Sequence, residues 1–599
     1  MNRMVPAHYI RRNEKANVPS RLVVLDTIPR RVRVGETESQ SWWFGVVSFN
    51  HWTRHGRLIQ EYRKYTDAGL MWKEIGDFTR PKRRTILYSH NLPYDLRIAD
   101  GLRHLSGLAF KLESIRLANQ GAWSRWTRDK ASLTLCDSSS IFPVQLSRLE
   151  SLLGSHRIAP TDTDDIDVWG DYCAVGVQHL TDILRQYFDW LKTGVAGNWQ
   201  LTGAGQSWAH WRHSHYTHPV LVHPDDEAIK AERRAMWTGR AENWSWGKDL
   251  DAPVYEWDWA NSYPRIGRDY DVPVRLVGTA RTANATELPR LAERYTILAD
   301  VTIRTEQPVV PTRRDGRILW PVGEFKSTLW WPEIEAVLSE GGTVTPHCIW
   351  LYRSEPALQE WGTWIINQVH GKGAIAYPWV PLVLKHWSRT LIGRFATQYQ
   401  NWEEFGTERD SKVQVGKLFD VDTGLMTDVM QVGHDLHIMT GLSESDDSCP
   451  QITSYIMSVA RRRLWDALQA VGSENVLYMD TDSLIVNMEG HVILTELTKL
   501  GQFNGLRLKD RHRGYEIYGP RSAIIGSRRV FAGMPKAAVR TGEKTFQGEV
   551  WTNLEKSLSI GEADRVTIQP RTFTVRYNDN RRQRAEGGRT VPHRLGPEA

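Results

Sequence analysis

Short apolar runs alternate with amphipathic stretches along most of the chain, and this pattern predicts a mixture of strands and helices. Three runs have the length and composition typical of buried strands: residues 21–25, 254–257 and 295–303. In residues 452–468 apolar side chains recur every four positions, which places them on one face of a helix. A second amphipathic stretch covers residues 177–191. The pattern predicts an α+β fold made of several subdomains.

An acidic turn between two apolar runs is the sharpest local feature of the sequence. Residues 476–479 and 484–486 are strand-like, and Asp480 and Asp482 stand between them in the run YMDTDS. This arrangement predicts a β-hairpin whose tip carries both carboxylates. Like charges a few ångströms apart repel one another, so a cation is expected to neutralise them. Magnesium, which takes oxygen ligands and leaves positions open for phosphates, suits such a tip; an ordinary Asp-rich turn is the alternative.

A further carboxylate, Asp258, ends another predicted strand in the run YEWDWANSYP (residues 255–264). Two metal ions held by carboxylates from separate strands would activate an attacking oxygen and stabilise a leaving one. Spacing alone does not establish that Asp258 meets Asp482, because more than 200 residues separate them.

Composition narrows the class of protein. Of the 599 residues, 41% are apolar and 24% charged, as in globular proteins with several cores. No apolar run is long enough for a membrane span. The four cysteines lie too far apart for a zinc site or a disulfide framework, so a reducing, cytoplasmic setting is expected.

The net charge of +6 is small for a protein that binds a polyanion, but it is unevenly placed. Residues 501–599 contain 19 Lys and Arg against 10 Asp and Glu, which leaves −3 for the first 500 residues. Basic residues gathered at one end predict phosphate contacts whose strength falls with salt. The arginine-rich residues 581–599 are expected to form a mobile basic tail, and residues 194–218, rich in Gly, Trp and His, a connector with few core-building residues.

Three segments together resemble the polymerase motifs of family B DNA polymerases, in the viral, plasmid and organellar branch that includes protein-primed enzymes. Residues 258–264 (DWANSYP) are similar to D-x-x-S-L-Y-P, residues 478–483 match Y-x-D-T-D-S, and residues 385–396 correspond to K-x-x-x-N-S-x-Y-G-K-F-A. The resemblance implies an α+β multidomain fold, with an RNase H-like exonuclease domain followed by a right-hand polymerase of palm, fingers and thumb. It also implies a DNA-directed DNA polymerase that adds deoxynucleotides to a 3′ hydroxyl.

The resemblance assigns roles at the polymerase site. Asp258 and Asp482 would hold two Mg²⁺ ions, with Mn²⁺ as an alternative, and Asp480 would add charge beside them. Lys385 would meet the triphosphate as a compact cation, and Tyr263 would pack under the sugar and exclude a 2′-hydroxyl. The implied nucleotide-binding residues are Asn261, Tyr263, Lys385 and Arg389.

Four further positions are implied to contact DNA: Gly239, Arg240, Gly393 and Arg521. Residues 236–240 (MWTGR) keep one glycine of the family's Y-x-G-G motif, and Arg521 stands where the family's K-x-Y motif has its cation. The family's Asn-Ser pair is replaced by Arg389 and Thr390 and its Tyr by Ile392, so nucleotide selection is expected to differ.

The N-terminal unit resembles the family's 3′–5′ exonuclease domain but lacks two of its four acids. The second exonuclease motif is intact at residues 90–95 (HNLPYD), whereas the first, D-x-E, has Ile28 in its acidic position, and the third, Y-x-x-x-D, ends in Gly176. The remnants are Asp26, Asn91, Asp95 and Tyr172. We expect a retained fold without efficient proofreading, the alternative being compensation by Asp167 or Asp171 in a shifted register.

The expected organisation has five parts: an exonuclease-like domain (1–195), a connector (196–235), palm and fingers with inserted subdomains (236–505), a thumb (506–580) and a basic tail (581–599). The expected partners of this monomer are a DNA template-primer, deoxynucleoside triphosphates and a terminal, or priming, protein, with no membrane. Priming by an RNA or DNA primer, or primer-free initiation, remains an alternative. A non-catalytic DNA-binding protein of polymerase shape is the rival interpretation.

Overall fold

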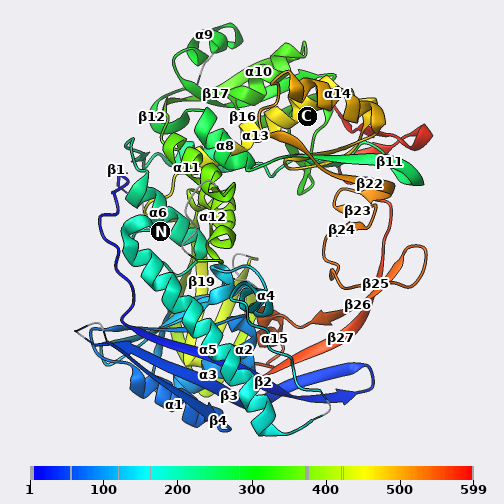
Figure 1. Cartoon of the computed structure of the whole chain (residues 1–599). Helices are drawn as coiled ribbons and strands as arrows, with labels where there is room; N and C mark the ends of the chain where they lie inside the picture. The colour runs from blue at the N-terminus through cyan, green and yellow to red at the C-terminus, as the bar shows by residue number, and fades with distance from the viewer. Residues whose placement is uncertain are drawn as a thin grey trace.

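The computed structural model describes residues 6–596 except 54, 56, 119–120, 162, 282–283, 372–376, 420 and 422–423. Its main sheets belong to an N-terminal domain, a central region and an inserted subdomain, and a C-terminal arm runs between the first two (Figure 1). The mixture of helices and sheets in separate subdomains confirms the α+β prediction. In the described part of the chain, no helix combines the length and apolar character that crossing a membrane requires.

The N-terminal domain is built on the strand order β4-β3-β2-β5-β8. Its strands are β2 (Arg21–Val34), β3 (Thr37–Trp52), β4 (Leu58–Tyr65), β5 (Arg84–Ser89) and β8 (Ala131–Asp137), extended by β7 (Trp123–Arg128) and β6 (Lys111–Arg116). The first three strands are antiparallel, whereas β5 runs parallel to β2 and β8 parallel to β5. Parallel neighbours require crossover connections, which helices supply here. This is the expected RNase H-like arrangement.

Both faces of this sheet are covered, which explains the unbroken apolar run in β2. Leu22 and Val24 pack in a core that includes α5 (Ile166–Trp190), while Val23 and Leu25 pack in a second core on the opposite face. Helices of that second face are α1 (Ala68–Phe78), α2 (Leu92–Ile98) and α3 (Gly101–Gly107).

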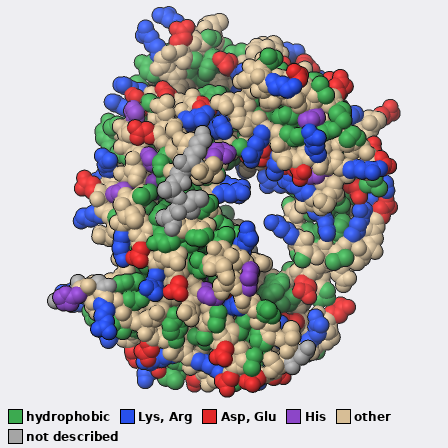
Figure 2. Space-filling view, in the orientation of Figure 1, with side chains coloured by type: hydrophobic (Ala, Val, Ile, Leu, Met, Phe, Trp, Pro, Cys, Tyr) green, Lys and Arg blue, Asp and Glu red, His purple; other side chains and the backbone are tan. Residues whose placement is uncertain are grey.

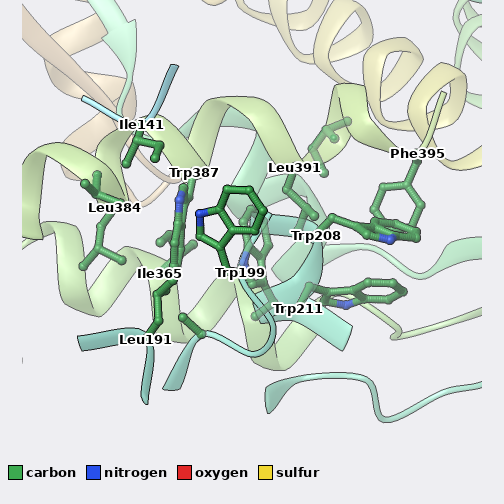
Figure 3. Packing of buried hydrophobic residues seen from close by; sticks show 14 of the residues in the cluster. Ile141, Leu191, Trp199, Trp208, Trp211, Ile365, Leu384, Trp387, Leu391 and Phe395 are labelled. Atoms are coloured by element: carbon green, nitrogen blue, oxygen red, sulfur yellow. The ribbon is translucent and has the colours of Figure 1, made fainter. Parts of the chain in front are cut away.

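The prediction that the connector contributes little to the core is wrong. Helix α6 (Gly203–Ser214) packs along α12 (Val380–Arg394), and the side chains of Trp199, Trp208 and Trp211 are buried together with Trp387 (Figure 3). Each tryptophan contributes a large apolar surface, so a few of them build a core within a polar-looking sequence. Gly203 allows the close approach, since a Cβ there would lie 2.4 Å from the Ser140 carbonyl oxygen.

A seven-stranded sheet forms the central region, in the order β10-β20-β21-β11-β22-β23-β24. The strands are β10 (Ala241–Asn243), β11 (Gly247–Trp259), β20 (Val476–Asp480), β21 (Ser483–Val486), β22 (Leu506–Gly519), β23 (Ser522–Ile525) and β24 (Arg528–Phe531). The predicted hairpin is confirmed by the antiparallel pairing of β20 with β21. Helix α13 (Pro450–Val471), predicted from its apolar stripe, shares a core with this sheet.

The two long intervals of the sequence fold into insertions. The first forms a sheet of β12 (Val272–Ala280), β13 (Thr296–Thr305), β16 (Val322–Trp330) and β17 (Thr343–Glu355), flanked by α10 (Trp331–Ser339). The second is a long two-stranded hairpin of β18 (Gln398–Phe419) and β19 (Met426–Glu444). Helices α8 (Ser262–Asp269), α11 (Gln359–Val369) and α12 pack against one another.

The C-terminal arm joins the central region to the N-terminal sheet. Its strands are β25 (Val539–Arg540), β26 (Thr545–Trp551) and β27 (Arg565–Thr574), and β27 pairs with β3 from Arg565 opposite Ser41 to Ile568 opposite Glu38. The arm therefore closes a ring (Figure 1), and Figure 2 shows an opening through the molecule with Lys and Arg side chains around it.

The prediction of a mobile basic tail is also wrong for the described residues 581–596. They form β28 (Arg582–Arg584), β29 (Thr590–Pro592) and β30 (Arg594–Leu595), and β30 extends the inserted sheet by pairing with β16. The Arg582 side chain is 2% exposed, lies 3.7 Å from the Trp244 ring centroid and donates to Thr590. A planar guanidinium can be buried in this way because it stacks on aromatic rings while its N–H groups find acceptors.

Candidate active site

The structure brings together the acidic residues that the sequence left far apart. Asp258, at the end of β11, lies opposite Ser483 of β21, and the Trp259 amide donates to the Asp482 carbonyl oxygen at 3.0 Å. Asp482 follows directly on Asp480 and Thr481 at the hairpin tip. Carboxylates from two separate strands thus meet at one edge of the seven-stranded sheet, as the proposed pairing of Asp258 with Asp482 requires.

The hairpin tip is fixed by the segment that precedes β10. Thr481 adopts a left-handed backbone with φ of 63°, and its amide donates to the Arg240 carbonyl oxygen at 2.7 Å. A Cβ on Gly239 would lie 2.6 Å from the Thr481 hydroxyl oxygen, so the absence of a side chain at residue 239 permits this contact. The structure thus gives Gly239 a role in holding the acidic turn.

The prediction that the Arg240 side chain binds DNA is wrong, because this side chain is buried. It is 1% exposed, its Nε lies 2.6 Å from Glu242, and it donates to the Pro308 carbonyl oxygen. A buried cation needs such a carboxylate partner to offset its lost hydration. Arg240 supports the tip through its backbone and anchors the sheet through its side chain.

The charges at the tip fit a divalent cation. Burial, and next the neighbouring Asp258 carboxylate, raise the pKa of Asp482 to about 6. A cation between the two acids would offset both effects, and carboxylate oxygens are ligands that Mg²⁺ takes, together with substrate phosphates. Among the described residues, no three His, Cys, Asp or Glu side chains form a metal-holding group, so the protein's contribution would be this pair of acids.

Asp480 lies on the other side of the tip, beside Arg521. The Asp480 carboxylate accepts from the Thr481 hydroxyl at 2.9 Å and lies 3.7 Å from the Arg521 guanidinium. The Arg521 amide donates to the Tyr478 hydroxyl at 2.9 Å, which ties the β22–β23 turn to the hairpin. The predicted DNA-contacting arginine is therefore next to the predicted acids, and its side chain is half exposed.

A basic collar that the sequence analysis missed surrounds this edge of the sheet. Arg507 lies 3.4 Å from Asp258, and Lys509 lies 2.7 Å from Glu256. Burial would raise the pKa of Glu256, but hydrogen bonds from Arg528 and Lys509 outweigh burial and lower it to about 2. Glu256 stands two residues before Asp258, so both acids lie on one face of β11. From this two-residue spacing, the sequence could have predicted that Glu256 lies beside Asp258.

Tyr263 and Asn261 lie where β11 turns into α8. Asn261 has a left-handed backbone with φ of 55°, and its side chain contacts the His370 ring nitrogen at 3.2 Å. Tyr263 is mostly buried, and burial, followed by the charge of Asp482, raises the pKa of its hydroxyl. The charge of Asp482 thus acts on Tyr263 across the site.

Lys385, Arg389 and Gly393 share one exposed face of α12, because they follow one another at intervals of four residues. The opposite face, with Trp387 and Ile392, is buried. Ile392 therefore fills the core. Helix α12 contacts α8, but within the described residues no hydrogen bond or ion pair joins its exposed face to the acids.

In the N-terminal domain, Asp26 of β2 and Asp95 of α2 come together as the resemblance implies. Asp95 accepts hydrogen bonds from the hydroxyls of Thr27 and Ser89, and burial, then the Asp26 carboxylate, raise its pKa well above the usual range. Asn91 precedes α2 with a left-handed backbone. The sequence analysis missed Arg157, whose guanidinium lies 3.6 Å from Asp26 and 4.4 Å from the Tyr172 ring centroid.

No protein-family model and no curated protein sequence matches the chain. Solved structures do match over nearly its whole length. Phi29 DNA polymerase in a ternary complex with primer-template DNA and incoming nucleotides has a TM-score of 0.63 and 11% identity, covering 94% of this chain and 100% of that chain. The same polymerase with primer-template DNA, and with single-stranded DNA, each gives 0.61 over 93% of this chain and 100% of that chain, at 13% and 12% identity.

The chain therefore has the fold of this protein-primed family B polymerase. The names palm and exonuclease-like domain, which the resemblance implies, are used below for the seven-stranded sheet and the N-terminal domain.

Proposed function

We propose that this protein is a DNA-directed DNA polymerase that adds deoxynucleotides to a 3′ hydroxyl. The observation that carries the proposal is the meeting of Asp258 and Asp482 at one edge of the palm sheet. The pair stands on a fold shared with DNA polymerases, and a cation between the two acids would offset the burial and like charge that raise the pKa of Asp482.

Asp258 and Asp482 would hold Mg²⁺, or Mn²⁺ in its place; when bound, the ions would supply charge stabilisation for phosphoryl transfer. The remaining tasks fall to residues of this chain. Tyr263, in the first turn of α8, would pack under the deoxyribose. The exposed cations Lys385 and Arg389 would bind the triphosphate, and Arg521 would bind a primer phosphate next to Asp480.

Primer extension with deoxynucleotides and Mg²⁺ tests this proposal. Wild-type protein is expected to extend a primer, whereas Asp258→Ala and Asp482→Ala are expected to lose the activity while binding primer-template DNA. Asp189→Ala, at an exposed acid of α5 in the N-terminal domain, is the matched control and should extend like wild type. Extension that survives both palm substitutions would contradict the assignment, and a wild type that binds DNA without extending it would favour the rival DNA-binding protein.

We further propose that synthesis is primed by a terminal protein and proceeds without efficient proofreading. The support for priming is the fold shared with a protein-primed polymerase, together with the two insertions at the expected places. Adding a candidate terminal protein to template and one labelled deoxynucleotide tests it: a covalent protein–nucleotide product supports protein priming. A reaction that depends only on an RNA or DNA primer contradicts it. Removal of a mismatched 3′ end that depends on Asp26 and Asp95 would contradict the loss of proofreading.

A further inference from the structure

The acids of the N-terminal domain surround an arginine. Arg157, in the segment between α4 (Leu146–Leu152) and α5, extends into the domain so that only 12% of its side chain is exposed. Its Nε lies 2.6 Å from the buried carboxylate of Glu150, and one terminal nitrogen lies 3.6 Å from Asp26. The same nitrogen donates to the Tyr172 carbonyl oxygen at 3.1 Å. The guanidinium is therefore held from several sides.

Gly176 provides the space that the guanidinium fills. A Cβ at residue 176 would lie 2.1 Å from a terminal nitrogen of Arg157 and 2.4 Å from its central carbon. At such distances something must shift, so any side chain at this position would displace the guanidinium of Arg157 from its present place. Glycine inside a helix is unfavourable by about 1 kcal/mol relative to alanine, and here the compensation is the room it leaves for a cation.

Divalent ions do not fit this site as it stands. The resemblance places an acid at residue 176, where the structure has the Arg157 guanidinium, and an acid at residue 28, where the structure has an isoleucine packed in the core. The oxygens of Asp95 are engaged by the Thr27 and Ser89 hydroxyls. Beside Asp26, the positive charge is already supplied by a side chain of the protein, Arg157.

We propose that Arg157 is a built-in cation that replaces the divalent ions of an exonuclease, so that the acids of the N-terminal domain form a permanent structural ion cluster. Arg157 balances the charges of Asp26 and Glu150, and Gly176 keeps its place open. The arginine and the glycine are thus a matched pair: either is disfavoured without the other. The inference concerns the N-terminal domain alone, and its failure would leave the polymerase proposal untouched.

Removing the arginine should uncover a site for a divalent ion. Mn²⁺ alone is the probe, and the loss of the electron paramagnetic resonance signal of free Mn²⁺ counts bound ions in the full-length protein. The background is Asp258→Asn with Asp482→Asn, which removes the palm acids. In this background, Arg157→Ala is expected to bind about one Mn²⁺ more than intact Arg157, and a further Asp26→Asn exchange should abolish the gain. Equal Mn²⁺ binding with and without Arg157 would overturn the proposal.

Thermal unfolding of the glycine pair gives an independent test that does not depend on metal binding. Gly176→Ala should lower the unfolding midpoint by several degrees, whereas Gly107→Ala, at an exposed helical glycine with open space around its missing Cβ, should leave it unchanged. Combining Gly176→Ala with Arg157→Met, which shortens the group and removes its charge, should lower the midpoint less than the two separate losses together. Additive losses, or a Gly176→Ala variant as stable as Gly107→Ala, would overturn the matched pair.

Discussion

The palm and the N-terminal domain each bring two aspartates together from distant parts of the chain, but they balance the charges differently. In the palm, Arg507 lies 3.4 Å from Asp258, and its side chain is 59% exposed. In the N-terminal domain, Arg157 is buried between Asp26 and Glu150. An exposed arginine leaves an acid pair available for a cation and a substrate. A buried arginine between similar acids makes them part of the structure. The location of the positive charge, more than the number of acids, separates the two sites.

The largest expected effect on primer extension comes from removing one aspartate from each site. Asp482→Ala should reduce primer extension by about 10³-fold, because stabilisation of several kcal/mol by the ions it would hold is lost. Asp26→Ala should leave extension within about twofold of wild type. Single-turnover extension with saturating deoxynucleotide measures both. If Asp26→Ala impairs extension as strongly as Asp482→Ala, the two sites are not functionally separate.

A second contrast concerns the arginines. Arg157→Ala should destabilise the protein by about 3 kcal/mol, because it leaves buried carboxylates without their cation. Arg507→Ala should change stability by less than about 0.5 kcal/mol, since an exposed ion pair contributes little. Urea denaturation followed by tryptophan fluorescence compares them. Similar losses of stability for both variants would contradict the distinction between a buried and an exposed arginine.

Within the palm, Asp482 and Glu256 should contribute to stability with opposite dependences on pH. The pKa of Asp482 is raised from 3.8 to about 6, so its contribution to stability is full below pH 4 and is lost as the pH rises through 6. Without divalent ions, Asp482→Asn should therefore exceed wild type by about 2 kcal/mol above pH 7 and show no advantage below pH 4.

Glu256, which has cationic partners in Lys509 and Arg528, should behave in the opposite way. Its pKa is lowered from 4.5 to about 2, so it stabilises the protein above pH 4.5 and loses this effect as the pH falls toward 2. Glu256→Gln should be less stable than wild type by about 2 kcal/mol at pH 7, and the difference should shrink on acidification. Chemical denaturation across this pH range, in the presence of a chelator, measures both variants; shifts of the same sign would contradict the assignment.

The smallest expected effect belongs to an exposed cation beside the palm acids. Arg521→Ala should weaken binding of primer-template DNA by a few-fold and reduce the slope of log affinity against log salt by about one, as expected for a single phosphate contact. Arg185→Ala, an exposed arginine of the N-terminal domain paired with Asp182, is the control and should preserve the slope. Fluorescence anisotropy at several salt concentrations decides the matter, and an unchanged slope for Arg521→Ala would exclude the contact.

Local patterns predicted local structure well. The hairpin around Asp480 and Asp482 and the helix over residues 452–468 were predictable because neighbouring residues determine both. The approach of Asp258 to Asp482 was not a matter of local pattern, and only the resemblance to a known family indicated it. Arg157 gave no signal, because its partners come from separate elements; the missing acid at Gly176 was visible, but the occupant of its space was not.

The failed predictions share one physical cause. Arg582 and the tryptophans of α6 were interpreted from residue type, as tail and connector, and Arg240 from its place in a family motif, as a DNA contact. Arginine and tryptophan are amphipathic, and whether they are buried depends on the aromatic rings and carboxylates that the fold brings near. Composition cannot supply that information.

The pairing of β27 with β3 holds the ring closed. Four residue pairs, from Arg565–Ser41 to Ile568–Glu38, join the arm to the N-terminal sheet, and the buried Arg97 adds a hydrogen bond to Ser557 of α15 (Leu554–Ser559) at 3.0 Å. If a DNA duplex occupies the opening, the closed ring links it topologically to the protein. A linear DNA can thread through the ring from one end, but a covalently closed circular DNA can enter only after the pairing of β27 with β3 opens. Loading on circles, unlike loading on linear molecules, would then be limited by the rate at which a short β-ladder opens.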